Sequence, residues 1–420
     1  MRLTPLLAAA GLLALTACAP SATSSGTSSQ PSSSGKVTLS YWQWGPIENQ
    51  KKMFAEYEKT HPGVTIEPRQ PGTPTEYDTI LSTGLAGEKG PDVVLLRAGA
   101  NLQPLVEAGR LEPIDPAVVK DFDPQVIAAA KGDKDGKVYG VPFALQTLNV
   151  IYNKKIFADN GITPPTTWDE MLAAAEKLKS KGVIPFAFGG KDDWMLPVVA
   201  SIFGTSRWGG DAFLEAVKAK QKKFADPDFV AGIDLLNKLM PYFPKDAPAV
   251  SYTDAQILFS SGKAAMFPGG VWELSFFKEN APGIELGTFT PPPSPGSVSA
   301  KPQMPGFTDG SYGVNAKSPH KKEAMEFVSW LATKEYGQLY ADTVTQFSAV
   351  PGIKPKDPLL GQIATEREQD GAAYFMNAFA YGNPSSQAVF SGALQKMLLG
   401  KITPKQAAED LDKSVATWLK

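Results

Sequence analysis

The sequence predicts an α/β protein of two lobes, preceded by an apolar N-terminal segment and a polar tether. Segments rich in β-branched and aromatic residues alternate with segments of helical apolar spacing, which is typical of parallel β-α-β units. The region from Lys36 to Lys420 exceeds the length at which a single core stops growing, about 250–300 residues, so two lobes are expected. Residues 1–35 have neither pattern and are interpreted separately.

The first residues are typical of a secretory signal. Met1 and Arg2 give a positive start, and an apolar run from Leu6 to Leu15 follows. That run is too short to cross a bilayer, which needs about 20 apolar residues. A buried N-terminal helix is the weaker alternative, because no amphipathic period or cap accompanies the run. We expect residues 1–17 to be removed on export.

Cys18 is the one cysteine among 420 residues, so an intramolecular disulfide is impossible. The segment Leu15–Cys18 resembles the lipobox of bacterial lipoproteins, whose cysteine is acylated and becomes the mature N-terminus. That resemblance implies an exported protein, lipid-anchored to the outer face of the cell membrane (or its periplasmic side). The residues from Ala19 to Gly35 are small or polar and uncharged, so residues 18–35 are expected to form a flexible tether.

Composition excludes several classes of function. The formal net charge is −2 with acids and bases interspersed, which argues against nucleic acid as a partner. His61 lies at an expected helix end and His320 at an expected helix start, and no second cysteine is present, so neither a metal site nor a Ser-His triad is expected. No Walker-type phosphate loop occurs. We expect no cofactor.

The expected elements of the folded region follow from periodicity and from turn residues. Proline and glycine in the segment 61–63 end the first helix. The elements, in order, are a strand at 37–42, a helix with an apolar face at Met53, Phe54 and Tyr57, a strand at 64–66, a helix near 76–86, a strand at 93–96, and extended segments at 136–143 and 148–153.

Three later helices have recognisable start signals. Thr167 and Glu170 form a capping box, in which the two side chains satisfy each other's backbone amides, and the helix runs to about Lys181. The pair Ser318–Pro319 predicts a helix start with proline at the first helical position. Thr403 repeats the cap pattern for a final helix.

A series of short segments along the mature chain carries a family resemblance. The segments are Trp42–Trp44, Phe54–Lys59 with His61–Val64, Gly90–Val94, Leu105–Gly109, Leu111–Asp115, Gly140–Phe143, Tyr152–Lys154, Pro164–Glu170, Gly262–Met266, Gly270–Trp272 and Gly313–Asn315. In this order and spacing the chain resembles the extracellular solute-binding proteins of bacterial ABC importers, in the carbohydrate group (family 1) that serves maltose and other oligosaccharides. The pattern is specific for the family and poorly specific for the ligand.

The resemblance implies a two-lobe periplasmic-binding-protein fold (type II-like) with a hinge and a central ligand cleft. By that analogy lobe one holds residues 36–143 and 309–349, and lobe two holds residues 144–308 and 350–420. The implied function is capture of a sugar, mono- or oligosaccharide, and its delivery to the transmembrane subunits of an ABC permease. A monomer without catalytic residues is expected. A ligand in the cleft agrees with the general position of ligand sites at domain interfaces.

A sugar site pairs flat aromatic rings with planar hydrogen-bonding groups, because a sugar has an apolar C–H face and an edge of hydroxyls. Trp272 is the strongest candidate because the glycines before it allow close backbone approach. Arg97 directly follows a strand expected to be buried, so it emerges at the strand's carboxyl end. The full set of candidate ligand-binding residues is Trp44, Glu48, Arg97, Gln146, Trp194, Trp272, Phe307 and Asp309.

Several candidates have an ordinary structural alternative. Trp44 can plug the end of a strand, Glu48 can complement a helix dipole, and Gln146 can satisfy loop backbone. Trp208 beside Gly209 is a further possible ligand residue. Three other tryptophans fall at apolar helix positions and are expected in the core: Trp168, Trp330 and Trp418.

Rival functions come from other classes. A binding protein of the same fold can take a non-sugar solute, such as a polyamine, an iron complex or a peptide. A surface glycoside hydrolase needs only two carboxylates across a bond, but no fold-level pattern for such an enzyme is present. A cell-surface adhesin has no need of a closing two-lobe body. The sequence does not name the sugar, its length or its linkage.

Overall fold

The computed structural model describes residues 35–74, 76–88 and 90–419. Cys18 and the predicted signal segment 1–17 lie outside the described residues, as does the tether up to residue 34. Among the residues described, no helix combines the length and the apolar character that crossing a membrane requires.

The first lobe is built on a sheet with the strand order β2-β1-β3-β11-β4, in which β5 also pairs with β11. β1 pairs in parallel with β2 and β3, as the alternation of strands and helices predicts. β11 arrives from far along the chain and runs antiparallel to β3. The strands are β1 Val37–Trp42, β2 Val64–Arg69, β3 Val93–Arg97, β4 Leu111–Glu112, β5 Val141–Pro142 and β11 Gly310–Asn315.

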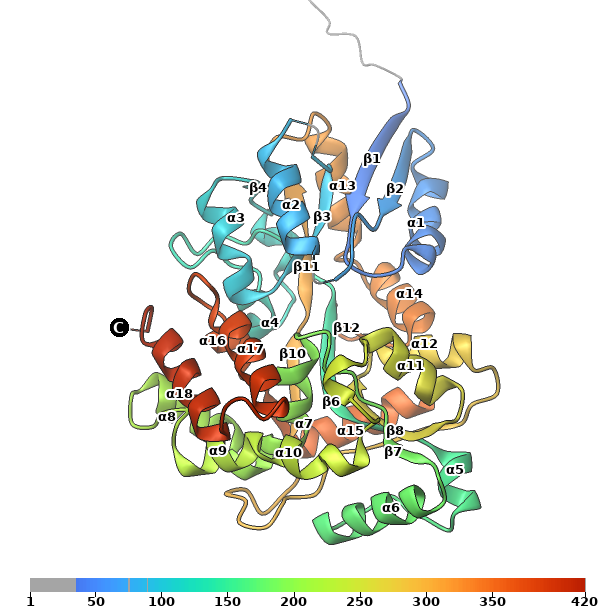
Figure 1. The fold of residues 1–420 in the computed structure, drawn as a ribbon. Helices are drawn as coiled ribbons and strands as arrows, with labels where there is room; N and C mark the ends of the chain where they lie inside the picture. Colours follow the sequence, from blue (N-terminus) through green and yellow to red (C-terminus); the bar gives the residue numbers. More distant parts are fainter. Residues whose placement is uncertain (1–34, 75, 89, 420) are drawn as a thin grey trace, which may run out of the picture. The chain divides into compact units, whose positions relative to one another are not determined.

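Helices cover this sheet and bury apolar faces against it (Figure 1). In α1 the buried residues are Met53, Phe54 and Tyr57, as predicted, and Phe54 meets Phe327 of α13 edge-on at 5.0 Å. The helices are α1 Glu48–Thr60, α2 Tyr77–Ala86, α3 Gln103–Glu107, α4 Pro124–Ala128, α13 Lys321–Trp330 and α14 Lys334–Val344, with short 3-10 turns η1 Gly99–Asn101 and η2 Pro116–Val119.

The second lobe contains a sheet with the order β13-β10-β6-β8-β7, and β9 and β12 also pair with β6. Contrary to a purely parallel β-α-β pattern, the long strand β6 is antiparallel to β8, β9, β10 and β12. Alternation along the chain does not fix the direction in which distant segments return to a strand. The strands are β6 Ala144–Asn153, β7 Ile184–Phe186, β8 Ala264–Gly270, β9 Leu286–Phe289, β10 Met304–Thr308, β12 Phe347–Ser348 and β13 Gly371–Ala373.

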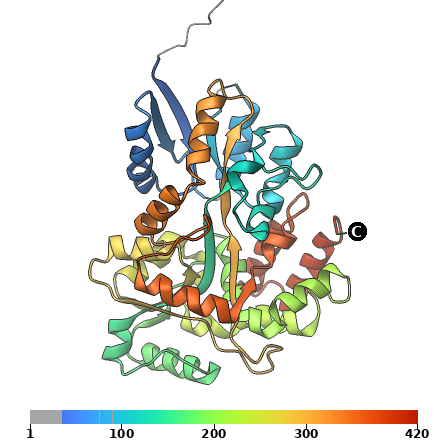
Figure 2. The same cartoon turned by 180° about the vertical axis from the view of Figure 1, so that it is seen from behind.

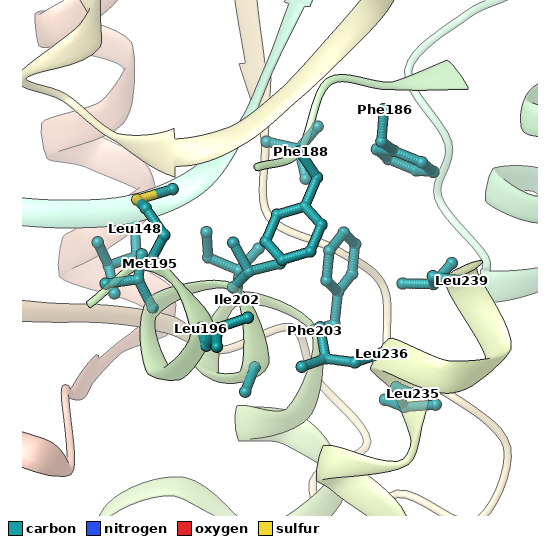
Figure 3. Packing of buried hydrophobic residues seen from close by; sticks show 14 of the residues in the cluster. Leu148, Phe186, Phe188, Met195, Leu196, Ile202, Phe203, Leu235, Leu236 and Leu239 are labelled. Atoms are coloured by element: carbon teal, nitrogen blue, oxygen red, sulfur yellow. The ribbon is translucent and has the colours of Figure 1, made fainter. Parts of the chain in front are cut away.

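The core of the second lobe forms around α7, whose residues are almost all buried. Figure 3 shows Phe188 and Phe203 converging with leucines from neighbouring helices and from β6. The helices of this lobe are α5 Lys154–Asp159, α6 Trp168–Ser180, α7 Met195–Trp208, α8 Gly210–Lys218, α9 Pro227–Ile233, α10 Leu235–Leu239, α11 Tyr252–Ser260, α12 Glu273–Asn280, α15 Pro358–Asp370, α16 Met376–Phe379, α17 Ser386–Leu398 and α18 Pro404–Val415, with 3-10 turns η3 Met240–Tyr242 and η4 Ala247–Ala249. α15 crosses the back of the sheet in Figure 2.

Two of the sequence-based helix starts are confirmed and one is wrong. Thr167 and Thr403 both form complete capping boxes. The helix expected at Ser318 begins instead at Lys321. The Ser318 hydroxyl donates to the buried Asp92 carboxylate at 2.6 Å and accepts from the His320 amide at 3.0 Å, so Ser318 lies in the turn before the helix.

The tryptophans expected in the core differ in burial. Trp168 is buried, whereas Trp330 and Trp418 are half-buried. Trp208, considered as a ligand residue, is 1% exposed and packs on Phe229 at 4.9 Å, so it is a core residue.

Three segments pass between the two sheets side by side. They are the step from β5 to β6 at Phe143, the step from β10 to β11 at Asp309, and the residues around Ala349. Backbone hydrogen bonds join them: the Asp309 amide donates to the Ala144 carbonyl at 3.1 Å, and the Ala349 amide donates to the Phe143 carbonyl at 3.0 Å. The residue at which each lobe ends stays a prediction.

Candidate functional site

The step between the two sheets brings several predicted site residues together. Asp309 is the single residue between β10 and β11. On one side of it Phe307 lies opposite Gln146 of β6, and on the other side Gly310 lies opposite Arg97 of β3. Antiparallel partners point to the same face of a sheet. The backbone pairing alone therefore gathers residues from three distant parts of the chain.

Gln146, Asp309 and Gln346 form a hydrogen-bonded polar group at this step. Gln146 Nε2 donates to Asp309 Oδ2 at 2.9 Å and to Gln346 Oε1 at 3.0 Å. Gln146 is buried, and its own Oε1 has no hydrogen-bond partner among the described residues. A buried acceptor without a donor costs about 1–3 kcal/mol, so a hydroxyl that donates to Gln146 Oε1 would be favourable here.

Burial raises the pKa of Asp309, while the nearby Arg97 charge and the hydrogen bond from Gln146 act in the opposite direction. The carboxyl is only half-buried by its exposed surface. Its remaining oxygen can accept a hydrogen bond from a ligand. The group therefore offers an acceptor carboxylate beside an acceptor amide, which suits a ligand rich in hydroxyl donors.

Trp44 and Arg97 form the first-lobe part of the site. The Arg97 guanidinium lies 4.3 Å from the centroid of the Trp44 ring, a cation–π contact. Arg97 also donates to the Pro74 carbonyl at 3.0 Å and lies 3.4 Å from the Asp78 carboxylate. A Cβ added to Gly310 would be 3.0 Å from the Trp44 ring, which places this ring over the start of β11, beside Asp309.

Five aromatic rings of the second lobe form a continuous group, here called the aromatic cluster: Trp194, Tyr252, Trp272, Phe307 and Tyr374. Trp272 is its centre, with ring centroids 6.3 Å from Trp194 and 6.4 Å from Phe307. Tyr252 meets Trp194 edge-on at 5.0 Å, and Tyr374 lies 5.1 Å from Phe307. The cluster runs from α11 and the start of α7 to the step at Asp309.

Glycine before Trp272 is required by this geometry. A Cβ on Gly270 would lie 1.9 Å from the Trp272 ring, far inside van der Waals contact. The sequence analysis selected this tryptophan because glycine lets another group approach the backbone closely. In the structure, the group that approaches Gly270 is the Trp272 ring itself. Trp272 is half-buried, so part of its surface remains available to a ligand.

The structure thus places seven of the eight candidates in the polar group, the first-lobe pair and the aromatic cluster, and leaves one apart. Glu48 is exposed at the first turn of α1, where a negative charge is favourable, and within the described chain no hydrogen bond joins it to any of these groups. Its role in ligand binding stays a prediction. The sequence analysis did not identify Tyr252, Gln346 or Tyr374, whose local sequences carry no signal; only the fold brings them to the site.

A cavity of about 310 Å³ adjoins Arg97. Asp78, Arg97 and Asn101 line it from the first lobe, and Tyr381 and Ser385 line it from the chain between α16 and α17. A larger hollow of about 630 Å³ lies beside α5 and the end of α12 and contains none of the candidate residues. Arg97 is the one candidate residue in the lining of this cavity.

Comparison with known proteins agrees with this architecture. The multiple sugar-binding protein of Streptococcus mutans is 27% identical over 373 residues, which covers 85% of this chain and 86% of that protein. Among solved structures, a chitin oligosaccharide binding protein matches with a TM-score of 0.77 at 24% identity, covering 91% of this chain and 99% of that chain. The solute-binding protein RafE in complex with raffinose matches with a TM-score of 0.74 at 23% identity, covering 91% of this chain and 100% of that chain.

The family model for bacterial extracellular solute-binding proteins matches residues 47–338, a span that includes every candidate residue except Trp44, which lies just before it. The two sheets, the three adjacent steps between them and this match lead to one conclusion: the chain belongs to the family of bacterial extracellular solute-binding proteins.

Proposed function

We propose that this protein is the sugar-binding component of an ABC importer and that it delivers a carbohydrate to the permease. The observation that carries the proposal is that the aromatic cluster and the polar group adjoin in the chain, because Phe307 of the cluster lies near the end of β10 and Asp309 of the polar group directly follows that strand. Aromatic faces suit the C–H face of a sugar, and the carboxylate and amides suit its hydroxyls. Relatives named for sugars support the same ligand class.

The proposed mechanism is closure of the two lobes about the three adjacent steps. Free protein samples an open state, and a sugar that contacts both lobes favours the closed one through its differential affinity. Trp44 and Arg97 contact the sugar from the first lobe, and Trp272 from the second. The sugar is bound and released unchanged, so the protein performs no covalent chemistry.

The N-terminal segments complete the proposal. Residues 1–17 direct export, Cys18 carries the lipid anchor, and residues 18–35 hold the binding domain away from the membrane. Two acyl chains are needed for stable anchoring, since each buried methylene adds about 0.8 kcal/mol and a single chain binds only reversibly. The domain itself acts as a monomer in this proposal.

A thermal-shift screen of the mature chain, residues 18–420, tests the ligand class. The panel contains galactose, maltotriose, raffinose, stachyose, chitotriose and xylotriose, with spermidine, ferric citrate and a tripeptide as the contrast set. A ligand at 100 times its dissociation constant adds about 2.7 kcal/mol to the free energy of unfolding, which gives a clear shift. A shift from a sugar, with the sugar recovered intact by chromatography, is the expected result. A shift only from the contrast set would contradict a sugar ligand.

Trp272→Ala separates the site from the fold. We expect the variant to lose the sugar-induced shift, because the central ring of the aromatic cluster is gone. Trp330→Leu on α13 removes a half-buried tryptophan far from the cluster and serves as the control: it should lower the melting temperature while retaining the sugar-induced shift. An unchanged shift in Trp272→Ala would contradict the assignment of this ring.

A further inference from the structure

A fully buried carboxyl group lies directly beneath the aromatic cluster. Glu273 is the first residue of α12 and has no exposed surface. Trp272, its neighbour in the chain, occupies the cap position of the same helix. Acidic residues are common in the first turn of a helix, but they are normally exposed. Burying a carboxylate costs several kcal/mol unless other groups compensate, so the helix dipole does not explain this residue.

The compensating groups are three hydrogen-bond donors, two of which belong to the aromatic cluster. Glu273 Oε1 accepts from the Trp272 indole Nε1 at 2.9 Å and from the Tyr252 hydroxyl at 2.6 Å. Glu273 Oε2 accepts from Gln256 Nε2 at 2.8 Å. Hydrogen bonds to a charged group are stronger than neutral ones and fix the geometry of both partners.

We propose that Glu273 is a positioning residue for sugar binding: its carboxylate holds the Trp272 and Tyr252 rings in the orientation that a sugar contacts. Trp272 contacts both Trp194 and Phe307, so fixing its ring also fixes the centre of the cluster. The inference rests on the proposed function for the sugar, but the link between Glu273 and the two rings can be tested without any ligand.

The indole makes this arrangement sensitive to the charge of Glu273. An indole N–H is a donor only, so Oε1 must stay an acceptor. A proton on Glu273 therefore has to be on Oε2, where it faces the Gln256 Nε2 donor, and the Gln256 amide must then turn its oxygen toward it. If the proton is on Oε1 instead, the Trp272 ring must move. Burial raises the pKa of Glu273 to about 7, although all three hydrogen bonds act to lower it. The carboxyl thus changes charge near neutral pH.

The groups that face this carboxyl come from two elements and from the turn before α12. Tyr252 and Gln256 project from α11, and Trp272 lies at the turn. β8 contributes Gly269, where an added Cβ would lie 3.3 Å from Glu273 Cγ. Asp192 faces the same tyrosine, since its carboxylate accepts from the Tyr252 backbone amide at 2.7 Å. Burial, together with the charge of Glu273, raises the pKa of Tyr252 well above its usual value.

The first test follows tryptophan emission of the ligand-free mature chain between pH 5.5 and 8.5. The wild type should change its emission with a midpoint near pH 7, and Glu273→Gln should abolish that change. Trp272→Phe identifies the reporting ring among the eight tryptophans and should abolish it too. Glu279→Gln, an exposed carboxylate on the same helix, is the matched control and should leave the midpoint in place. A transition that persists in Glu273→Gln would overturn the link between Glu273 and the Trp272 ring, and if no transition occurs in this range the second test decides the positioning role.

The second test measures binding of raffinose, or of the panel sugar with the largest shift, by calorimetry at pH 8. Glu273→Leu removes the acceptor, and its affinity should fall about tenfold below that of Glu273→Gln, which keeps one carbonyl oxygen for the indole. Equal affinities of the two variants would overturn the positioning role. If Glu273→Leu does not fold, Glu273→Gln and the pH titration still decide the question. A wild type that binds no sugar of the panel contradicts the proposed function, and the ligand-free titration then decides the role of Glu273 alone.

Discussion

Gly270→Ala is a single-methyl change that tests the placement of Trp272. Gly270 has an ordinary backbone conformation, so alanine introduces no backbone strain. The new methyl group would lie 1.9 Å from the Trp272 ring. Carbon atoms approach to about 3.5–4.0 Å, so the ring must move by roughly 1.5–2 Å. The Glu273 hydrogen bond and the contacts with Trp194 and Phe307 oppose that movement.

Two energetic consequences follow from this displacement. Overpacking in a well-packed region costs about 1–3 kcal/mol, so we expect the free energy of unfolding to fall by that amount. Sugar affinity should fall at least about tenfold, which corresponds to about 1.4 kcal/mol, because the displaced ring no longer offers the same face. Guanidinium denaturation measures the first effect, and calorimetric titration with the sugar measures the second.

Gly392→Ala is the matched control. Gly392 lies inside α17, and an added Cβ there meets nothing within 4 Å. Alanine is about 1 kcal/mol more favourable than glycine in a helix interior, so this variant should be more stable and bind sugar as the wild type does. If Gly270→Ala also kept wild-type stability, affinity and tryptophan emission, the assigned position of the Trp272 ring would be wrong.

Three further predictions concern other parts of the chain. Asp309→Asn should be at least as stable as the wild type at neutral pH. Burial raises the pKa of Asp309, so the carboxyl group contributes less to the free energy of unfolding as the pH rises through that pKa. The same variant should bind sugar about tenfold more weakly, because it loses a charged hydrogen-bond acceptor. Denaturation and calorimetry at pH 7 check both effects, and a less stable variant with full affinity would contradict them. Thr403→Ala should lose about 1 kcal/mol of stability with its capping box, as measured by denaturation, without a change in sugar affinity. Cys18→Ala should move the protein from the membrane fraction to the soluble exported fraction in a bacterial host that acylates lipoproteins, and retention at the membrane would refute the anchor.

The sequence was sufficient for the local features that depend on short-range chemistry. The apolar face of α1 at Met53, Phe54 and Tyr57 follows from helical spacing, and the cap at Thr167 follows from the residue three positions later. Ser318 shows the limit of such signals. Its hydroxyl accepts from the His320 amide, as the local pattern suggests, but the same hydroxyl also donates to the buried carboxylate of Asp92, and that partner lies 226 residues away.

The candidate site likewise contains residues that their neighbours in the sequence mark and residues that only the tertiary packing brings there. A glycine pair marks Trp272 in the sequence and a strand end marks Arg97, and their role in ligand binding stays a prediction. Tyr252, Gln346 and Tyr374 could not be predicted, because their place depends on how α11, the segment after α14 and β13 pack around β6 and β10. Trp208 lies beside glycines as Trp272 does, yet it is 1% exposed, so the glycine signal alone does not separate a binding ring from a core ring.

The position of Asp309 between β10 and β11 has a consequence for the order in which a ligand is recognised. In a rigid rotation of one lobe against the other, displacement grows with distance from the axis, and an axis through the three adjacent steps passes close to Asp309 and Gln146. Their spacing to Arg97 then changes little between the two extremes of the motion. We expect a first sugar hydroxyl to bind there before closure, whereas contacts farther from the axis form only as the lobes close. The contacts formed before closure would thus depend on a sugar hydroxyl being present, and the contacts formed during closure would depend on the size of the sugar.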